Sequence, residues 1–315
     1  MSTNIDNLKT PDVIYGPVPS RRLGRSLGVD LVPYKTCSYD CIYCQLGRTT
    51  NKTIKRKEYV PVDVIIDQLK NKLDSKPDYI TLSGSGEPTL FSKLEELIRK
   101  IHEISDIPVV VLTNGSLLWR PKVRQSLMLA DIAAPSLDAG TEELFNYINR
   151  PDPKIKFDAM LEGLVKFRQE YAGMYWLEVF LLSGLTTVEV QVNALSNCIR
   201  KIDPDKVQLN TATRPPSEDF ALPVPQDQLK DIAKRLYGNV EIIAEYKYDR
   251  QVREFAVHAE DILSLLKRRP CSTEDIAAGL GLHINEVVKY IERLTLAEKI
   301  ETDVRNQRLY YRAKL

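Results

Sequence analysis

The chain has 315 residues, which is enough for one large domain and one small one. Charged residues make up 28% and hydrophobic residues 43%, as in an ordinary globular protein, and no apolar run is long enough to cross a bilayer. The formal net charge of +1 excludes a global attraction to nucleic acid, so any such argument must be local. The first residues are polar and contain no apolar signal segment, so we expect a cytoplasmic protein without a membrane partner.

Strand-like and helix-like segments alternate from about residue 60 to about residue 250, after a first strand-like run at residues 28–32. The further strand candidates are short apolar runs at residues 79–83, 109–113, 132–137, 176–182, 206–211 and 240–245. Between them, apolar residues recur at helical spacing, as at residues 62–73, 94–101 and 161–165. This alternation predicts an α/β fold with a parallel sheet covered by helices. Periodicity alone leaves two forms open, a doubly wound sheet and a barrel.

Three cysteines, Cys37, Cys41 and Cys44, lie within eight residues directly after the first predicted strand. A closed structural zinc site and an ordinary 4Fe-4S cluster both need four ligands, and no fourth cysteine lies nearby. Three thiolates on a four-iron cluster leave one iron free to bind another molecule. Zinc binding with a remote histidine is the alternative. A disulfide framework is disfavoured because the number of cysteines is odd.

The spacing C-x3-C-x2-C, with the aromatic Tyr43 before the last cysteine, resembles the signature of the radical S-adenosylmethionine (SAM) superfamily. The resemblance implies a partial (β/α)6 barrel whose cluster loop, residues 37–44, follows the first strand. It implies two cofactors, SAM and a 4Fe-4S cluster held by Cys37, Cys41 and Cys44. An external one-electron reductant of the flavodoxin or ferredoxin type is the partner that it implies, because SAM is cleaved reductively to a 5′-deoxyadenosyl radical.

The second predicted strand ends in Ser-Gly-Ser-Gly-Glu-Pro, residues 83–88, which we call the glycine loop. It resembles the family's Gly-Gly-Glu motif, with Ser85 in the place of the first glycine. Because that motif binds the SAM amino group in the family, Gly84, Gly86 and Glu87 become predicted cofactor-binding residues. A tight turn before a helix would have a similar composition.

Polar residues also end the next two predicted strands, where ligands of parallel α/β folds gather. Asn114 follows the third strand, and Ser136 and Asp138 follow the fourth. These positions resemble those that contact the ribose or the methionine carboxylate of SAM in relatives, although ordinary turn chemistry explains them equally well.

Polar residues inside the two following strands point to the barrel interior. Glu178 lies in an apolar strand and therefore needs a partner or a ligand. Gln208 and Asn210 lie on one side of the next strand because side chains alternate, and we expect both to face the radical. The sequence identifies no catalytic residue beyond the cofactor ligands.

Two basic stretches flank the cluster loop, at residues 20–25 and 48–57. Guanidinium groups bind phosphate and carboxylate well, although charge runs are usually solvated surface. Residues 15–28 also resemble a subgroup near the wyosine-type tRNA-modifying Fe-S enzymes. The archaeal wyosine synthases use a second cluster, but only Cys198 and Cys271 remain here, far apart and in apparently helical segments. We expect both to be buried core residues.

The alternation ends near residue 251, which divides the chain into a core of residues 1–250 and a C-terminal domain of residues 251–315. Helices are predicted at residues 259–266, from a capping Ser272 onward, and at residues 285–296, with strands at residues 300–302 and 309–311. This order resembles a small winged-helix domain. We expect the apolar face of its third helix to contain Val288, Ile291 and Leu294.

A winged helix can bind nucleic acid through its third helix and wing. Here only the wing is basic, with Arg305, Arg308 and Arg312, whereas the third helix also carries Glu286 and Glu292. Protein binding and a structural role therefore stay open.

These features predict a radical SAM enzyme that acts on a macromolecular substrate, either RNA or a peptide or protein. The competing hypothesis is a DNA-binding winged-helix regulator whose cluster senses redox state. A sensor does not need the glycine loop or the polar strand ends, so these features favour the enzyme.

Overall fold

An eight-stranded sheet with the order β1-β2-β5-β6-β7-β8-β9-β10 forms the centre of the molecule. The structure, a computed structural model, describes residues 12–20, 22–243, 259–280, 282–305 and 308–314. Strand β1 (Ile14–Ser20) is antiparallel to β2 (Gly24–Asp30), and every later neighbouring pair is parallel. The other strands are β5 (Tyr79–Ser83), β6 (Val109–Thr113), β7 (Ile132–Pro135), β8 (Met174–Leu181), β9 (Lys206–Thr211) and β10 (Val240–Ile242).

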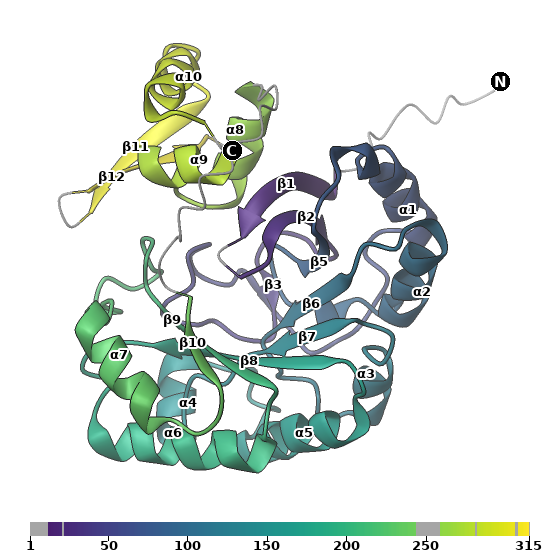
Figure 1. Ribbon diagram of the computed structural model, residues 1–315, viewed down its shortest axis with the longest axis vertical. Helices are drawn as coiled ribbons and strands as arrows, with labels where there is room; N and C mark the ends of the chain where they lie inside the picture. Colours follow the sequence, from purple (N-terminus) through teal and green to yellow (C-terminus); the bar gives the residue numbers. More distant parts are fainter. Residues whose placement is uncertain (1–11, 21, 244–258, 281, 306–307, 315) are drawn as a thin grey trace.

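Helices cover the outer face of this sheet, which curves into the predicted partial (β/α)6 barrel (Figure 1). They are α1 (Val62–Lys70), α2 (Leu94–Ile104), α3 (Pro121–Gln125), α4 (Glu142–Asn149), α5 (Phe157–Glu170), α6 (Glu189–Ile202) and α7 (Gln226–Arg235). Two 3-10 turns, η1 (Leu73–Ser75) and η2 (Pro88–Leu90), and two short paired strands, β3 (Thr36–Cys37) and β4 (Asn51–Lys52), lie in the connections.

The strands predicted at residues 79–83, 109–113 and 206–211 coincide with β5, β6 and β9. Strand β1 was not predicted, because Gly16, Pro17 and Pro19 within it are typical of turns and edges. Its place at the edge of the sheet accommodates these residues, since prolines there need not donate to two neighbours. The predicted strand at residues 240–245 begins with β10, and its last two residues lie outside the described part of the chain.

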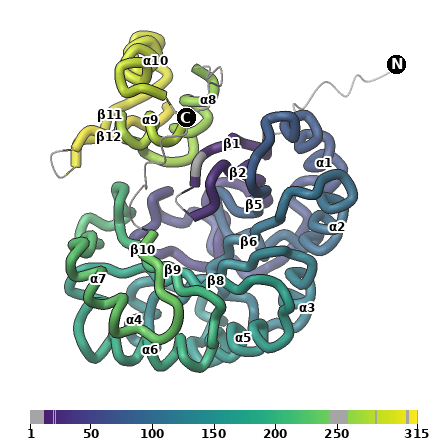
Figure 2. The backbone as a smooth tube through the Cα atoms, in the orientation of Figure 1, coloured from purple at the N-terminus to yellow at the C-terminus, as the bar shows by residue number. Residues whose placement is uncertain are grey.

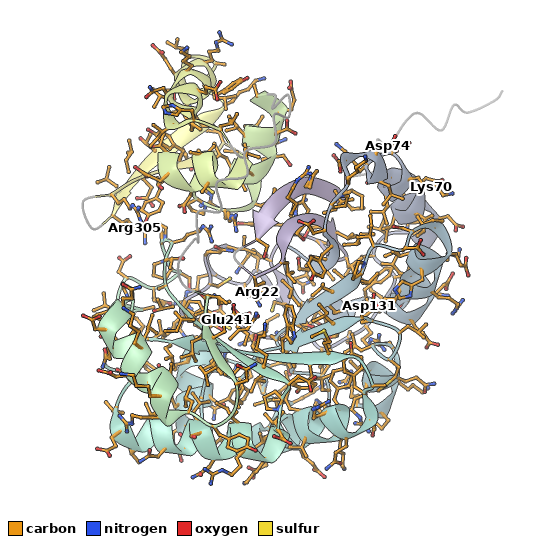
Figure 3. All side chains as sticks on the ribbon, viewed as in Figure 1. Arg22, Lys70, Asp74, Asp131, Glu241 and Arg305 are labelled. Carbon is orange, nitrogen blue, oxygen red and sulfur yellow. The ribbon has the colours of Figure 1, made fainter. Side chains whose placement is uncertain are left out.

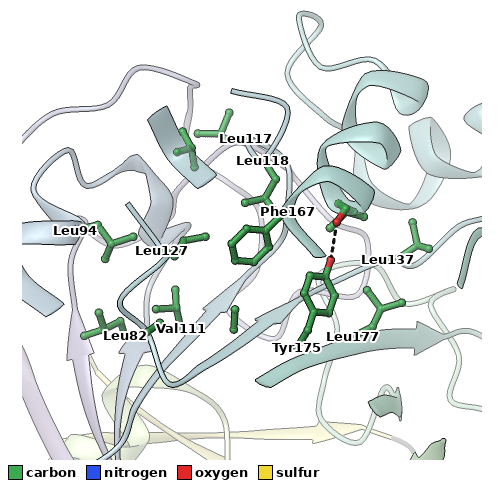
Figure 4. Close-up of a cluster of buried hydrophobic side chains, with 14 of the residues drawn as sticks. Leu82, Leu94, Val111, Leu117, Leu118, Leu127, Leu137, Phe167, Tyr175 and Leu177 are labelled. Atoms are coloured by element: carbon green, nitrogen blue, oxygen red, sulfur yellow. Dashed lines mark hydrogen bonds between the residues drawn. The ribbon is translucent and has the colours of Figure 1, made fainter. Parts of the chain in front are cut away.

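The main core fills the space between the sheet and its helices (Figure 4). Leu82, Val111 and Leu177 from the strands and Leu94 and Phe167 from the helices are fully buried. Burying each such side chain contributes roughly 1.5–3 kcal/mol. A second cluster, on the opposite side of the same strands, fills part of the barrel interior with Leu23, Val110, Ile132, Ala134 and Trp176. Burial on both faces explains why the strands read as continuous apolar runs.

A C-terminal module, the described residues from 259 onward, has a core of its own and packs through α8 and α9 against β1 (Figures 1 and 2). It contains α8 (Ala259–Arg268), α9 (Thr273–Leu280), α10 (Ile284–Leu296) and a hairpin, the wing, of β11 (Ile300–Arg305) and β12 (Arg308–Ala313). This is the predicted order of elements, and the boundary near residue 250 lies outside the described residues.

Two expectations about the C-terminal module were wrong. Ile291 and Leu294 of α10 are buried, as expected, but the third buried residue of this helix is Val287, whereas Val288 is 51% exposed. Cys271 is not helical but lies before α9, where it exchanges backbone hydrogen bonds with Tyr311 of β12. Both Cys198 and Cys271 are buried, as expected. Within the described residues, no helix has the length and apolar character that spanning a bilayer requires.

Candidate functional site

A cavity of about 430 Å³ opens at the carboxyl ends of the barrel strands. Its size is typical of a cofactor or ligand site. The C-terminal module closes one side of the cavity with Leu265, Arg268 and Arg269. All the predicted cofactor and metal residues line it, namely Cys37, Cys41, Cys44, Gly84, Gly86, Glu87, Asn114, Ser136 and Asp138. The structure therefore brings residues from three strand ends together with the cluster loop.

Each of the three cysteine sulfurs accepts a hydrogen bond from a different part of the barrel. Asn114 Nδ2 lies 3.5 Å from Cys37 Sγ, and Asn149 Nδ2 lies 3.5 Å from Cys41 Sγ. Lys35 Nζ lies 3.4 Å from Cys44 Sγ and also donates to the carbonyl of Gly47. Such donors stabilise the thiolate form and orient metal ligands.

Burial raises the pKa of the Cys37 thiol to about 12, with a further contribution from the Glu87 carboxylate. Burial also raises the pKa of Cys41 well above its usual value, assisted by Asp138. Thiols in this environment bind protons tightly unless a metal replaces them, so loading the site must release protons.

The arrangement fits a cluster better than a single ion. Among the described residues, no three histidine, cysteine, aspartate or glutamate side chains converge on one metal ion. A four-iron cluster instead takes each thiolate on a different iron, so its ligands stay apart. The three cysteines of the loop line one cavity, and each sulfur accepts a hydrogen bond from its own donor.

The glycine loop is pressed between β2 and the cluster loop, and its glycines make that approach possible. Gly84 has a φ of +114°, and a Cβ there would lie 1.5 Å from Asp30 Oδ1. A Cβ on Gly86 would lie 1.9 Å from the carbonyl oxygen of Thr36, next to Cys37. Any side chain at either position would displace the loop from the cavity.

Glu87 is 1% exposed and joins the ends of β5 and β6. Its Oε1 accepts hydrogen bonds from the backbone and hydroxyl of Thr89 and from the hydroxyl of Thr113, and its Oε2 accepts from Asn114 N. Burial raises the pKa of Glu87 while these hydrogen bonds lower it. Since Oε2 accepts only one of these hydrogen bonds, it can accept another from an ammonium group.

Asp138 ties the cluster loop to the far side of the barrel. Its carboxylate accepts from the Tyr43 hydroxyl, from Asn149 Nδ2 at 2.7 Å and from Phe180 N at 3.1 Å. Burial raises the pKa of Asp138 to about 6. The Tyr43 ring stacks on Phe180 with their centroids 3.9 Å apart, which fixes the residue before Cys44.

Ser136 and Asn114 differ in how they are held. Asn114 Nδ2 also donates to the Ser38 hydroxyl at 2.9 Å, and its Oδ1 accepts from Ser116 N at 3.0 Å, so the side chain is fixed. The Ser136 hydroxyl lies 3.5 Å from the Thr113 carbonyl oxygen, a long contact that leaves it able to rotate towards a ligand.

Glu178 faces the barrel interior, as predicted, and accepts from Arg22 Nη2 and from Asn210 Nδ2, both at 2.9 Å. Arg22 comes from the turn between β1 and β2 and reaches into the barrel (Figure 3). Asn210 lines the cavity, whereas Gln208 is buried and is not among the lining residues.

Much of the two basic stretches is engaged inside the protein. Arg22 pairs with Glu178, and Arg25 donates to the carbonyls of Ser75 and Lys76. In the second stretch, Arg56 donates to the carbonyls of Thr89 and Phe91, and Arg48 pairs with Asp40 and Glu218. Lys52, Lys55 and Lys57 of this stretch are also exposed. Lys52 donates to two backbone carbonyls and Lys57 lies over the Tyr59 ring.

Sequence reasoning missed Lys35 and Asn149. Lys35 has a φ of +59° and is 3% exposed, a rare combination for lysine that only the folded structure reveals. Asn149 ends α4, more than 100 residues from Cys41, so no local motif could connect the two.

A second cavity, of about 740 Å³, adjoins the first on the side of the wing. Residues 211–214, at and after the end of β9, line both cavities. The wing contributes Val304, Arg308 and Tyr310 to the second cavity, and the loop after β9 contributes Leu222. The cavity with the cysteines and the cavity beside the wing therefore adjoin along residues 211–214.

Comparison with known proteins gives the family. A model of the radical SAM superfamily matches residues 31–202. The UPF0026 protein MJ1312 of Methanocaldococcus jannaschii is 36% identical over 272 residues, which is 84% of each chain. A solved radical SAM methyltransferase from Sphaerobacter thermophilus shares the fold, with a TM-score of 0.55 and 15% identity, over 69% of this chain and 65% of that one.

A protein of Brachyspira hyodysenteriae described as GTPase Obg is 40% identical over 309 residues. The match covers 96% of this chain, but this chain spans only 45% of that protein. This chain contains no Gly-Lys dipeptide, which a P-loop requires. The GTPase description therefore stays with that protein.

Proposed function

Because the chain belongs to the radical SAM superfamily, and is therefore an enzyme that uses a 4Fe-4S cluster and SAM, we propose that it modifies a macromolecular substrate, an RNA. When bound, the cluster supplies the electron that cleaves SAM to methionine and a 5′-deoxyadenosyl radical. Such enzymes need an external one-electron reductant, and we propose one of the flavodoxin or ferredoxin type.

The proposed cofactor residues follow from the cavity. Cys37, Cys41 and Cys44 hold the cluster, because their sulfurs line the cavity and each accepts a hydrogen bond. The glycine loop, with Gly84, Gly86 and Glu87, receives the SAM amino group. This role is supported by the remaining acceptor capacity of Glu87 Oε2 and by the close approach that the glycines allow.

The ribose and the methionine carboxylate of SAM are proposed to lie along the ends of β6 and β7. Asn114, Ser136 and Asp138 line the cavity there. Ser136 is the residue with the freest polar group, because its contact to Thr113 is long. Asn114 and Asp138 are already engaged with protein partners, so they act mainly by holding the cluster loop in position.

The proposal of a macromolecular substrate is supported above all by the two adjoining cavities. Residues 211–214 line both, so a chain-like substrate lying along the wing can place one unit next to the cluster. Arg214 and Arg308 line this route and are suited to phosphate. A small metabolite would need only the first cavity.

A peptide or protein is the second candidate substrate, in line with the proposed winged-helix character of the module. Apolar side chains of the second cavity favour it, since Leu222 and Val304, which line this cavity, are 49% and 69% exposed. Exposed apolar groups of this kind bind peptide side chains more readily than phosphates.

Stimulated SAM cleavage tests the proposal. Cluster-loaded protein, a strong reductant and SAM are mixed with total small RNA, with the same RNA after ribonuclease digestion, or with a cell protein fraction. We expect intact RNA to raise the rate of 5′-deoxyadenosine formation several-fold above the uncoupled rate, and digested RNA to lose this effect. Stimulation by the protein fraction alone would overturn the RNA proposal in favour of the peptide.

A further inference from the structure

One side chain of the C-terminal module reaches the edge of the glycine loop. Arg268, at the end of α8, forms an ion pair with Asp30, the last residue of β2. Its guanidinium carbon also lies 3.2 Å from the centre of the Tyr15 ring, a stacked cation–π contact. The side chains of Arg268 and Asp30 are 19% and 15% exposed, so water screens this pair only weakly.

Both partners of Arg268 hold the glycine loop directly. Asp30 Oδ1 accepts from Ser85 N at 2.6 Å, and its Oδ2 lies 3.3 Å from the Ser85 hydroxyl. The Tyr15 hydroxyl is hydrogen-bonded to the Ser83 hydroxyl at 3.2 Å. Arg268 is thus connected to the beginning of the loop through Tyr15 and to its middle through Asp30.

The backbone of the glycine loop lies directly against the Asp30 carboxylate. Gly84 lies so close to the Asp30 carboxylate that a Cβ would lie 1.5 Å from it. On the other side, Ser85 O accepts from Lys35 N at 2.7 Å, which connects the loop to the segment before Cys37. A shift of the Asp30 carboxylate would therefore move the backbone that faces the SAM amino group.

We infer that Arg268 is a positioning residue for SAM, so that the C-terminal module completes the SAM site as well as serving the substrate. Removing the guanidinium leaves the Asp30 carboxylate without its cation in a weakly hydrated place, where an unpaired charge is costly. The carboxylate then turns towards water and releases Ser85. The inference rests on the proposed role of the glycine loop in binding SAM.

Linkage gives this contact a consequence. If docking of the C-terminal module raises the affinity for SAM, then bound SAM must shift the docking equilibrium towards the docked state by the same factor. A substrate that holds the module in place would thereby raise the affinity for SAM, which couples substrate arrival to cofactor binding.

The competing explanation is that Arg268 only fastens the two parts of the chain together. A matched control is available, because Arg305 of the wing forms another ion pair across the same boundary, with Asp219 at 2.8 Å (Figure 3 labels Arg305). Within the described part of the chain, Arg305 bonds to Asp303 and Asp219, neither of which belongs to the glycine loop or contacts Arg268. Its loss should loosen docking without altering the loop.

The test compares Arg268→Met, Arg268→Lys and Arg305→Met as full-length, cluster-loaded proteins, without substrate. The SAM dissociation constant is measured anaerobically, together with iron content, thermal unfolding and the electron paramagnetic resonance spectrum of the reduced cluster with and without SAM. We expect Arg268→Met to weaken SAM binding about tenfold, within the usual range of coupling factors, with unchanged iron content. Arg268→Lys should recover most of the affinity, and Arg305→Met should stay within about twofold of the parent.

Equal losses of SAM affinity in Arg268→Met and Arg305→Met would show that Arg268 serves docking alone, and unchanged affinity in Arg268→Met would also overturn the inference. If Arg268→Met is poorly folded, Asp30→Asn replaces it. That variant keeps an acceptor for Ser85 N but loses the ion pair, and it should also weaken SAM binding. Failure of the RNA proposal is a separate result, since no substrate is present in this titration.

Discussion

At the scale of single residues, the site depends on polar groups that neutralise or orient the cysteine sulfurs. Lys35 is the charged member of this set, 3.4 Å from Cys44 Sγ and 3% exposed. Its positive charge favours the reduced cluster, which carries one more electron. A unit charge about 5 Å from that electron, at an effective dielectric constant of about 20, contributes on the order of 3 kcal/mol.

We predict that Lys35→Met lowers the reduction potential of the cluster, because the methionine keeps the apolar stem and removes the charge. The estimate above corresponds to a fall on the order of 100 mV for a one-electron couple. A redox titration followed by electron paramagnetic resonance measures it. Lys52→Met is the control, because Lys52 is exposed and donates to the carbonyls of Arg150 and Pro151 instead of to a sulfur. Equal potentials in the Lys35 variant and the parent would contradict the prediction.

The residues with a local motif were predictable, and those with only tertiary partners were not. Cys37, Cys41 and Cys44 are recognisable from their spacing, and Glu87 from the glycines around it. Asn149 reaches the site from a distant segment, and nothing near it in the sequence indicates its partner. Arg22 lies in a basic stretch that the sequence singled out, but its partner Glu178 is 156 residues away and was not predictable.

At the scale of elements, the positions of the strand ends depend on how the helices behind them pack together. Helices α3 and α5 are joined by Arg124, whose Nε and Nη2 bind the two oxygens of Glu170 at 2.8 and 2.9 Å. Arg124 Nη1 also donates to the carbonyl of Leu118 at 3.0 Å, and the side chain is 7% exposed. This bidentate pair lies under the connection that follows Asn114.

Arg124→Met should lower the free energy of unfolding by roughly 2–3 kcal/mol, because the Leu118 carbonyl and both carboxylate oxygens of Glu170 lose this donor. Denaturant unfolding of parent and variant measures the change. The matched control is Lys166→Met, which removes an exposed pair with Glu162 from the same helix and should cost less than about 0.5 kcal/mol. A similar cost for both variants would contradict the assigned role of Arg124.

The stability that the Arg124–Glu170 pair contributes depends on pH. The hydrogen bond from Arg124 lowers the pKa of Glu170, so the stabilisation is present above the usual glutamate pKa and is lost as pH falls through the lowered value. The difference in stability between the parent and Arg124→Met should therefore shrink in acid.

Element boundaries were predictable where one face or both faces of an element are uniformly apolar, as in β5, β6 and β9. They failed at β1, whose prolines are tolerated because it is an edge strand. The boundaries of α10 were predicted to within one residue, but its adjacent valines made the buried face ambiguous. Sequence periodicity cannot resolve Val287 from Val288, since only the packing of α10 against α8 and α9 separates them.

At the scale of the whole molecule, the docking of the C-terminal module on β1 decides what the cavity can accept. The sequence predicted two parts of the chain but not that α8 would bring Arg268 into the first cavity. Such contacts depend on the shapes of two completed surfaces, which local patterns do not encode. The result is a cavity with walls from both parts, next to a second cavity that extends the proposed substrate route to the wing.

If RNA lies along this route, its phosphates should also contact the exposed lysines beside the cluster loop, Lys55 and Lys57. Neutralising both should flatten the dependence of log affinity on log salt by about 1.4, because each phosphate contact on a single strand contributes about 0.7. Binding of total small RNA at several salt concentrations measures the slope. Lys70→Ala with Lys72→Ala is the matched control, since both lysines are exposed at the end of α1, a helix that lines neither of the two described cavities, and should leave the slope unchanged. An equal change in both double variants would mean that RNA binds the surface without using the route to the cluster.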